Sequence, residues 1–267
     1  MNDYNIIDAR LVIRVSRHSL AFAVTDATAE NQVFFEPYVV KSGISIAANL
    51  REAFRESVLL GRGYRRVRVL MDTNPLLVPL QEYEEGQAEA LYQHAFTPQK
   101  GESIISTVMP EFNAVAVYPV NRDLRTVLED HFQDVRYEPL MIPVWQLMYQ
   151  RSFTGVRRKL YANFHDGKME VFSFDKNRFR FYNSFETRRP NDAVYFLLNV
   201  WKQLGMDADE DELHLSGELP EKEQLLDALH RFLKKAFVVS PSVVYNRAPA
   251  TQIKGMPLDL MIIFSKH

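Results

Sequence analysis

The chain opens with short apolar runs that alternate with polar stretches, a pattern that favours β-strands. Three such runs come first, and they are Leu11–Val15, Leu20–Thr25 and Gln32–Val40. The polar tetrapeptide Ser16–Ser19 between the first two predicts a hairpin. Apolar residues then recur at three- and four-residue spacing from Ile46 to Val58, which predicts a helix that Ser45 caps and Gly61 ends. The apolar run Val67–Met71 predicts a further strand.

The same order of patterns returns far downstream. Three β-rich runs come first again, and they are Leu160–Phe164, Met169–Phe174 and Arg178–Asn183. The dipeptide Asp166-Gly167 tolerates the positive φ angles of a tight turn and so predicts a hairpin. A helical stripe runs from Ala193 to Leu204, with Pro190 near its start and Gly205 at its end. The strand Glu212–Ser216 follows, and this matching order at a nearly constant offset indicates an internal duplication.

Further elements lie between the two copies and after the second. The helices expected between them are Glu82–Phe96, Asn121–His131 and Val144–Phe153, and the expected hairpin joins Ile104–Met109 to Ala114–Tyr118. An amphipathic stripe predicts a helix over Glu221–Phe237, and the tail Leu258–Phe264 fits either a strand or a helix. We therefore divide the chain into a first lobe, residues 1–150, with an inserted helix and hairpin, and a second lobe, residues 151–267.

Two consecutive units of three antiparallel strands, a crossover helix, a further strand and more helices resemble a pair of ribonuclease-H-like lobes. In detail, the segments LVIRVSRHSLAFAVTD, FNAVAVYPVNRDLRTVLEDHF and YANFHDGKMEVFSFDKNRFRFYNSFE resemble an uncharacterised bacterial family with the actin-like ATPase fold. The resemblance spans most of Leu11 to Val239. It implies an α/β fold of two duplicated lobes with mixed β-sheets flanked by helices, distantly similar to the actin-like proteins of pilus assembly and cell division. It brings no established activity.

The resemblance also implies where a nucleotide would bind. In actin-like ATPases the first hairpin of each lobe is a phosphate loop of the type Asp-x-Gly-Ser/Thr. Its glycine lets backbone amides approach the phosphates, and its aspartate organises a hydrated Mg²⁺. The first hairpin here reads Ser16-Arg17-His18-Ser19 and lacks both residues. Ser16 and His18 are the candidate ligand-binding residues of this loop, although a polar turn between two strands uses the same residue types.

The second hairpin and a later strand supply the other candidates. If Gly167 matches the glycine of the phosphate loop, the expected aspartate falls on His165, and Asp166 comes one position late. A plain Asp-Gly turn explains the same residues. The pair of glycines expected beside adenosine is reduced to Gly217, which also suits a strand-to-helix turn. The candidate cofactor site therefore consists of Ser16, His18, His165, Asp166, Gly167 and Gly217.

Composition and charge narrow the classes of function. Hydrophobic residues make up 46% of the 267 residues, which suits a folded chain with a sizeable core. The net charge of −2 lacks the basic excess of a dedicated nucleic-acid binder. The absence of cysteine excludes disulfides, thiolate catalysis and zinc–thiolate sites. We expect no membrane insertion, because no stretch approaches the ~20 apolar residues that a span needs, and we expect a cytoplasmic protein.

Three other groups of residues allow both a functional and a structural interpretation. The arginines at positions 62, 65, 66 and 68 around Tyr64 suit RNA phosphates and a stacked base, but charged loops are common, and we expect no nucleic-acid partner. The acidic run 207–212 is typical of a solvated loop, since a calcium loop needs a fuller ligand pattern. The aromatic residues of the second lobe's first strands predict core packing or, alternatively, an exposed patch for a partner. The seven histidines lack metal-ligand spacing, so we expect no metal.

Two functions of different classes lead, and an RNA-associated module that uses the Arg62–Arg68 cluster is a third possibility. The leading hypothesis is a non-catalytic actin-like binding or assembly module with degenerate nucleotide loops, no cofactor and a protein partner. The alternative is an ATP-binding ATPase or phosphotransferase with atypical phosphate loops, which uses ATP with Mg²⁺. No motif names a catalytic residue, so whether the protein is an enzyme stays open, as does its oligomeric state.

Overall fold

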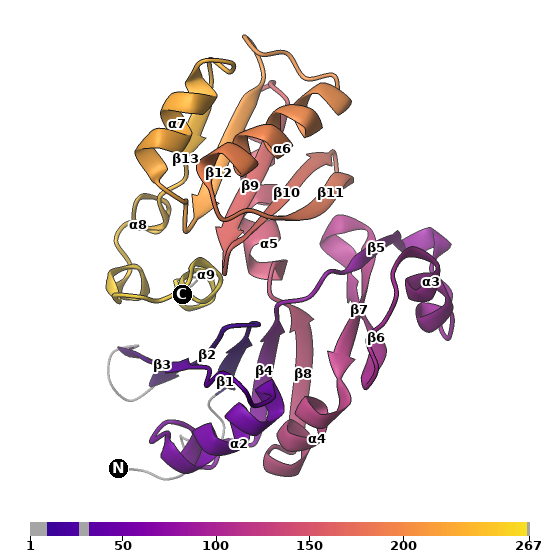
Figure 1. Ribbon diagram of the computed structural model, residues 1–267, viewed down its shortest axis with the longest axis vertical. Coiled ribbons are helices and arrows are strands. Elements are labelled where there is room, and N and C mark those ends of the chain that lie inside the picture. Colours follow the sequence, from indigo (N-terminus) through magenta and orange to yellow (C-terminus); the bar gives the residue numbers. More distant parts are fainter. Residues whose placement is uncertain (1–9, 27–31, 266–267) are drawn as a thin grey trace. The chain divides into compact units, whose positions relative to one another are not determined.

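A computed structural model describes residues 10–26 and 32–265 of the chain (Figure 1). These residues form two compact units. The first unit takes the described residues up to Ile142 together with those from Ala248 onward, and the second unit is Pro143–Arg247. Each unit contains a five-stranded sheet, and the first also contains a sheet of three strands. Within the described ranges, no helix has the length and apolar composition that crossing a membrane requires.

The large sheet of the first unit is mixed. Its strands in spatial order are β3 (Gln32–Val39), β2 (Ser19–Asp26), β1 (Arg10–Val15), β4 (Arg66–Met71) and β8 (Asp134–Pro139). β2 runs antiparallel to β1 and β3, whereas β1, β4 and β8 are parallel. The apolar runs of the sequence predict all of these strands except β8. Its sequence, DVRYEP, carries a charge at every second position, and it becomes a strand by pairing with β4 along its whole length.

Two helices of the first unit begin at side-chain caps. In α2 (Ile46–Glu56), Ser45 Oγ accepts the amide of Ala48 at 3.1 Å. In α4 (Arg122–His131), Asn121 Oδ1 accepts an amide three residues on at 3.0 Å. Each cap satisfies an amide that the first turn of a helix leaves without a partner. The predicted cap at Ser45 is confirmed.

The prediction that Gly61 ends α2 is wrong. Ser57 leaves the helical conformation, with a ψ of 125°, so the helix ends at Glu56. The Ser57 hydroxyl then accepts the amide of Leu60 at 3.0 Å and leads the chain into the 3-10 helix η1 (Leu60–Arg62), which contains Gly61. The Ser57 side chain competes for backbone groups, and α2 therefore ends before Gly61.

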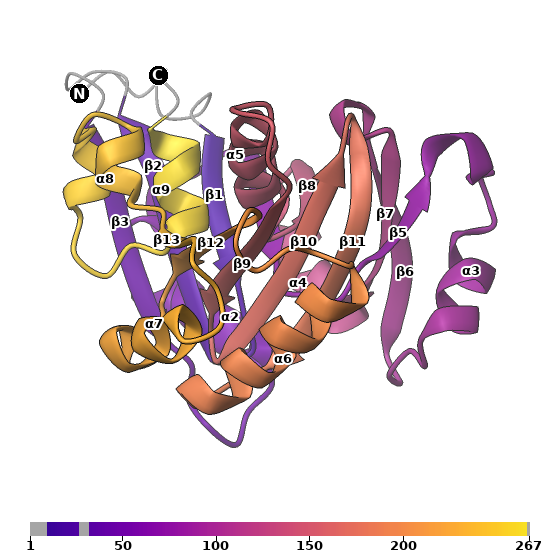
Figure 2. The same ribbon diagram turned by 90° about the horizontal axis from the view of Figure 1, so that it is seen from above.

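The three-stranded sheet holds the inserted part of the first unit (Figure 2). Its elements are the strands β5 (Leu76–Pro79), β7 (Ala114–Asn121) and β6 (Glu102–Met109) in spatial order, the short helices η2 (Leu80–Glu82) and η3 (Pro110–Phe112), and α3 (Ala88–Ala95). Tyr92 of α3 packs on Val115 and Val117 of β7. The predicted helix over Glu82–Phe96 is too long at its start, because Gly86 has a φ of 94°, which an α-helix does not continue through.

The sheet of the second unit repeats the order of the first. Its strands in spatial order are β11 (Arg178–Glu186), β10 (Lys168–Asp175), β9 (Lys159–His165), β12 (Glu212–Gly217) and β13 (Ala236–Val238). β10 is antiparallel to both neighbours, and β9, β12 and β13 are parallel. Matched in chain order, the two sheets have the same topology, which confirms the predicted duplication.

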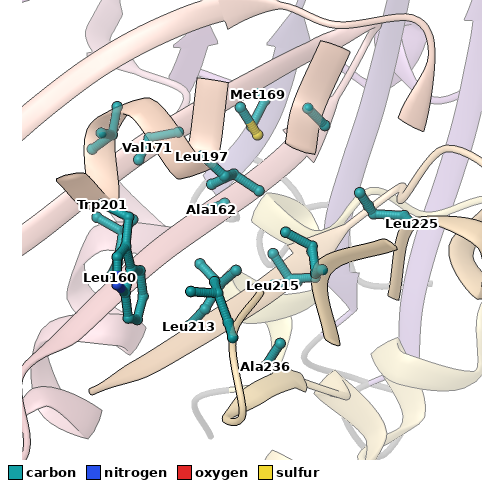
Figure 3. Close-up of a cluster of buried hydrophobic side chains, with 14 of the residues drawn as sticks. Leu160, Ala162, Met169, Val171, Leu197, Trp201, Leu213, Leu215, Leu225 and Ala236 are labelled. Atoms are coloured by element: carbon teal, nitrogen blue, oxygen red, sulfur yellow. The ribbon is translucent and has the colours of Figure 1, made fainter. Parts of the chain in front are cut away.

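Helices α6 (Pro190–Gln203) and α7 (Lys222–His230) cover one face of this sheet (Figure 3). Alternate residues of the buried strands, such as Leu160 and Ala162 of β9, meet Leu197 and Trp201 of α6 there. Each fully buried leucine-sized side chain stabilises the fold by about 1.5–3 kcal/mol. Alternate residues of the buried strands and the helical stripes of α6 and α7 therefore form one apolar layer.

The opposite face of the same sheet packs on α5 (Ile142–Ser152). Trp145 makes edge contacts with Phe179 and Tyr182, at ring-centroid distances of 5.2 and 5.3 Å. Tyr149 meets Phe174 in the same way at 5.3 Å. The predicted core packing is confirmed for these strands, since Phe181 and Phe185 pack on the α6 side while these other aromatic residues pack on α5.

The predicted helix over Glu221–Phe237 is wrong in its last part. α7 ends at His230, and Ala236–Val238 forms β13, which pairs with Leu213–Leu215 of β12. The apolar residues Leu233 and Ala236 fit a helical stripe and a buried strand equally well, and Ala236 is buried in the second unit's core. The segment is a strand rather than a helix because its pairing with β12 satisfies the backbone groups at the edge of that strand.

The two compact units differ from the division of the sequence at residue 150 in two places. α5, which follows β8 of the first unit, belongs to the second unit. The segment after Arg247, with η4 (Pro249–Gln252) and α9 (Leu258–Phe264), belongs to the first unit rather than the second. After α7, the second unit ends with the short helix α8 (Pro241–Val244). The tail Leu258–Phe264, for which a strand or a helix was expected, is a helix.

Candidate functional site

The first candidate loop is a tight turn between β1 and β2 that is closed by its own hydrogen bonds. The Ser16 amide donates to the Ser19 carbonyl oxygen at 2.9 Å. Ser16 Oγ accepts the amides of His18 at 3.4 Å and Ser19 at 3.1 Å. Ser16 is 2% exposed, whereas His18 lies on the surface. The amides of Ser16, His18 and Ser19 therefore bind inside the turn, whereas a phosphate loop directs its amides at the ligand.

A buried ion pair lies directly behind this turn. Arg14 of β1 is 2% exposed, and its Nε donates to both carboxylate oxygens of Asp259, at 3.2 and 2.9 Å. Arg14 Nη1 donates to Ser19 Oγ at 3.3 Å, and Ser19 Oγ lies 2.9 Å from Ser16 Oγ. Asp259 stands in the first turn of α9. A chain of polar contacts thus joins α9 to the hairpin.

Sequence reasoning missed both members of this pair. Arg14 and Asp259 are 245 positions apart, and no local pattern relates them. One signal was available, because Arg14 interrupts the otherwise apolar run Leu11–Val15 of a strand that is buried on both faces. A buried arginine needs an anion nearby.

The second candidate loop is a two-residue turn between β9 and β10. Asp166 and Gly167 have φ angles of 47° and 76°, and the flanking residues His165 and Lys168 pair across the ladder. Both positive angles are those that an Asp-Gly hairpin turn adopts. The predicted turn is confirmed, and Gly167 is required there by the backbone itself.

His165 lies in a buried polar network of the second unit. Its Nδ1 is 3.3 Å from Asp166 Oδ2, and its Nε2 is 3.4 Å from Glu170 Oε1. Glu170 is 1% exposed and accepts hydrogen bonds from Tyr182 Oη at 2.8 Å and Ser184 Oγ at 3.3 Å. These donors compensate the burial of the carboxylate. The two ring nitrogens of His165 therefore face different carboxylates.

Gly217 ends β12 where the backbone runs against β9. Its φ is 82°, and a Cβ placed on it would lie 2.1 Å from the carbonyl oxygen of Phe164 and 2.9 Å from Asn163 Oδ1. The next amide, of Glu218, donates to that same carbonyl at 2.8 Å. The close approach that requires glycine here is to the neighbouring strand. Gly217 and His165 are consequently brought together, since Phe164 precedes His165.

His214 is a second buried histidine on the face of the sheet away from α6. Its Nε2 is 2.9 Å from Glu212 Oε2, and its ring lies 5.5 Å from that of Tyr161. Burial lowers the pKa of His214, and the hydrogen bond that its Nε2 donates to Glu212 opposes that effect. Burial also raises the pKa of Tyr161. Both side chains are therefore neutral at pH 7.

Most arginines of the cluster contact other side chains of the first unit. Arg68 donates to Glu138 at 2.9 and 2.6 Å, and Arg62 stacks over Phe34 at 5.1 Å. Arg66 is 3.7 Å from Asp134. Tyr64, the aromatic residue that would stack on a base, is buried. Arg62, Arg66 and Arg68 thus each have a contact within the first unit.

Carboxylates of the acidic run 207–212 form ion pairs with basic side chains next to the neighbouring strands. Asp211 accepts from Arg158 Nη2 at 2.6 Å and from the Asp207 amide at 2.7 Å. Asp207 Oδ1 accepts the amides of Asp209 and Glu210, at 2.8 and 3.0 Å. These amide hydrogen bonds lower the pKa of Asp207. The run is a structured turn in which carboxylates cap backbone amides.

Many solved structures match the chain, and two examples match it over nearly its whole length. One is a Bacteroides thetaiotaomicron protein with actin-like ATPase fold and unknown function, which is 25% identical, with a TM-score of 0.87 over 100% of this chain and 99% of that one. The other is the PilM-PilN type IV pilus biogenesis complex, 12% identical, with a TM-score of 0.59 over 96% of each chain. The protein therefore has the actin-like ATPase fold that the resemblance implied.

The sequence comparisons agree with this assignment and add no activity. Comparison with curated proteins gives no match. The model of a family described as protein of unknown function (DUF3822) matches residues 2–236. Since that match covers most of the chain, the protein belongs to the DUF3822 family.

Proposed function

We propose that the protein is a non-catalytic actin-like module that binds a protein partner and needs no nucleotide to do so. The observation that carries this proposal is the first hairpin, where the amides of Ser16, His18 and Ser19 are bonded within the turn. A loop that binds phosphate directs such amides at the ligand.

The other candidate residues support the same proposal. Gly217 is explained by its contact with Phe164, and Gly167 by the φ angles of a two-residue turn. Neither hairpin contains the aspartate and glycine of the phosphate loop together in their expected places. Both glycines of the candidate site thus have a role within the fold.

A protein partner is favoured over a small substrate because Ser16 and His165 of the candidate site make polar contacts within the fold. The fold is shared with a protein solved in the PilM-PilN type IV pilus biogenesis complex, and that likeness extends to the fold alone. If the fold has no working nucleotide site, its function is to bind a partner through its surface.

Calorimetric titration of the purified, nucleotide-free protein with ATP and ADP, with and without Mg²⁺, tests the first half of the proposal. We expect no binding heat. Micromolar binding, about −8 kcal/mol, that requires Mg²⁺ and is lost in His18→Ala but kept in the exposed control His94→Ala, would contradict it and favour an ATPase or phosphotransferase.

Partner binding is tested by cross-linking, identification of the linked protein and reconstitution from the two purified chains. We expect a complex whose dissociation constant is the same with ATP and Mg²⁺ as without them. A complex that forms only in the presence of nucleotide would refute the proposal.

A further inference from the structure

Three buried polar atoms near the end of α5 have no hydrogen-bond partner. They are Oη of Tyr161, Nδ1 of His214 and Nε of Arg151, and none of the residues that the structure describes forms a hydrogen bond with them. Buried polar groups are nearly always paired, and an exception points to an ion, a ligand or a water molecule. We propose that these three side chains bind a small carboxylate and that one proton enters the site with it.

The sheet of the second unit brings the three side chains together. Tyr161 of β9 and His214 of β12 are partners in the parallel ladder, and their rings are 5.5 Å apart. Arg151 lies in the last turn of α5, and its carbonyl oxygen accepts from Lys159 Nζ at 3.4 Å. Lys159 precedes Tyr161 by two residues on β9, so both side chains lie on the face that packs on α5.

The charges at this place favour an anion. Burial raises the pKa of Tyr161, and the Arg151 guanidinium opposes that rise. Burial lowers the pKa of His214, and the charges of Arg151 and Lys159 lower it further, whereas Glu212 opposes them. The charged groups that act on His214 are therefore one carboxylate on its own strand and two cations, from α5 and β9.

The donors of the site suit a carboxylate. Arg151 Nε and Tyr161 Oη both donate, and a carboxylate oxygen accepts such bonds strongly. Tyr161 is 1% exposed and stacks on Phe172 at 5.5 Å, so apolar rings adjoin the site. A dianion such as phosphate or sulfate would bring more charge and more oxygens than these few donors satisfy, at a larger cost of burial.

The site has access to solvent. Arg151 is half-buried, and Phe237, whose ring is 5.6 Å from that of His214, is 46% exposed. Both side chains reach the surface. A small anion therefore enters beside them without the departure of any helix or strand.

The hydrogen bond of His214 explains the proton. Its Nε2 donates to Glu212 at 2.9 Å, so the neutral ring carries a lone pair at Nδ1. That lone pair repels an oxyanion, whereas a protonated Nδ1 donates to it. Since burial keeps the ring neutral at pH 7 in the free protein, the carboxylate binds with the uptake of one proton. Between about pH 8 and 6.5, its affinity should then rise about tenfold for each unit that the pH falls.

Titration of the full chain with acetate tests this inference. The unfolding temperature is measured in sodium acetate and in sodium chloride of equal ionic strength, at about pH 6.5 and 7.5. We expect a saturable rise in acetate alone, with half-saturation at an about tenfold lower concentration at the lower pH. In protein with ¹⁵N-labelled histidine, acetate should shift the Nδ1 signal of His214 to that of a protonated ring, and His214→Gln identifies the signal.

Tyr161→Phe separates binding from folding. Because Tyr161 Oη has no partner in the free protein, its removal should not lower the Tm in chloride, but it should weaken acetate binding about tenfold. Arg151→Met should abolish the response to acetate. Arg231→Met, which removes an exposed arginine of the same unit, is the matched control.

Three results would overturn the inference. The first is the absence of a saturable effect of acetate at either pH, as a water molecule alone at this place would give. The second is a response of Tyr161→Phe and Arg151→Met equal to that of the wild type. The third is a His214 ring that stays neutral in saturating acetate.

Sulfate tests the class of ligand. It stabilises proteins generally because it is excluded from their surface, so only the part of its effect that Tyr161→Phe removes reports on the site. That part should be smaller than for acetate, and a larger part would overturn the assignment to carboxylates.

The inference goes beyond the proposed function and does not rest on it. ATP binding by the wild-type chain would refute the proposed function and leave the carboxylate site standing. Absence of an acetate effect would remove the site alone.

Discussion

Gly217 ties the end of β12 to the middle of the second sheet. We expect Gly217→Ala to lower the free energy of unfolding by about 2–4 kcal/mol, because the new Cβ meets the Phe164 carbonyl at 2.1 Å and the φ of 82° is unfavourable for alanine. Gly101→Ala is the control: its φ is 90°, but nothing lies within 4 Å of the added Cβ. Urea unfolding should show a loss of only about 1 kcal/mol there. Equal losses would show that the backbone contact is unimportant.

His214 gives the protein a stability that depends on pH. Burial lowers its pKa in the folded state below the ordinary value of about 6.5. The unfolded chain then binds the proton first as the pH falls, so this contribution is complete above pH 6.5 and is lost as the pH drops below it. His214→Gln should flatten that part of the stability curve between about pH 7 and 5. The exposed His94→Gln should leave the curve unchanged, and a curve of His214→Gln parallel to the wild type would contradict the assignment.

At the scale of elements, ion pairs connect residues that lie just before three parallel strands of the second unit. Arg158 precedes β9, Asp211 precedes β12 and Lys235 precedes β13, and the acidic turn 207–212 lies between the basic ends. Asp211 is buried and accepts from Arg158 and from a backbone amide. The turn therefore aligns the strand ends as well as connecting them.

Replacement of Asp211 tests that role. We expect Asp211→Asn to destabilise the protein by about 1–3 kcal/mol, because its buried oxygens lose a charge-assisted bond. Asp209→Asn, which removes only the exposed ion pair with Lys234, should cost at most about 0.5 kcal/mol. Chemical denaturation gives the free energy of unfolding of the two variants. Similar losses would mean that Asp211 does not align the strand ends and that the acidic turn is a solvated loop.

At the scale of the whole molecule, the chain passes from the first unit into the second and back again. α5 belongs to the second unit through Trp145, which is fully buried and contacts Phe179 and Tyr182. Trp145→Ala should cost about 3–5 kcal/mol. Hydrogen exchange should show lost protection in β9, β10 and β11, with β1, β2 and β3 less affected. The opposite distribution would place α5 with the first unit instead.

Much of the fold could be predicted from the sequence because the local patterns agree with the elements that form in the packed molecule. Ser45, the Asp166-Gly167 turn and the stripe of α6 each have a structural meaning that depends on a few neighbours in the chain. The wrong helix end at Gly61 and the missed strands β8 and β13 share one cause. In each case a hydrogen bond formed at that place, from Ser57 or from the edge of a neighbouring strand, outweighed the local pattern.

The candidate site shows the same limit more sharply. The sequence identified the two hairpins and Gly217, but gave no sign that Asp259 lies beside Arg14 or that Glu170 lies beside His165. Such contacts are formed between strands or between distant parts of the chain. Their donors and acceptors have partners only after the sheets exist.

By itself, the sequence determined the duplicated order of strands and helices, since hydrophobic periodicity and turn residues act over a few positions. The tertiary structure alone decided which unit α5 and α9 join, which carboxylate meets Arg14, and whether Gly217 serves a ligand or a neighbouring strand. These outcomes depend on burial and on the pairing of polar groups, both of which are properties of the packed molecule.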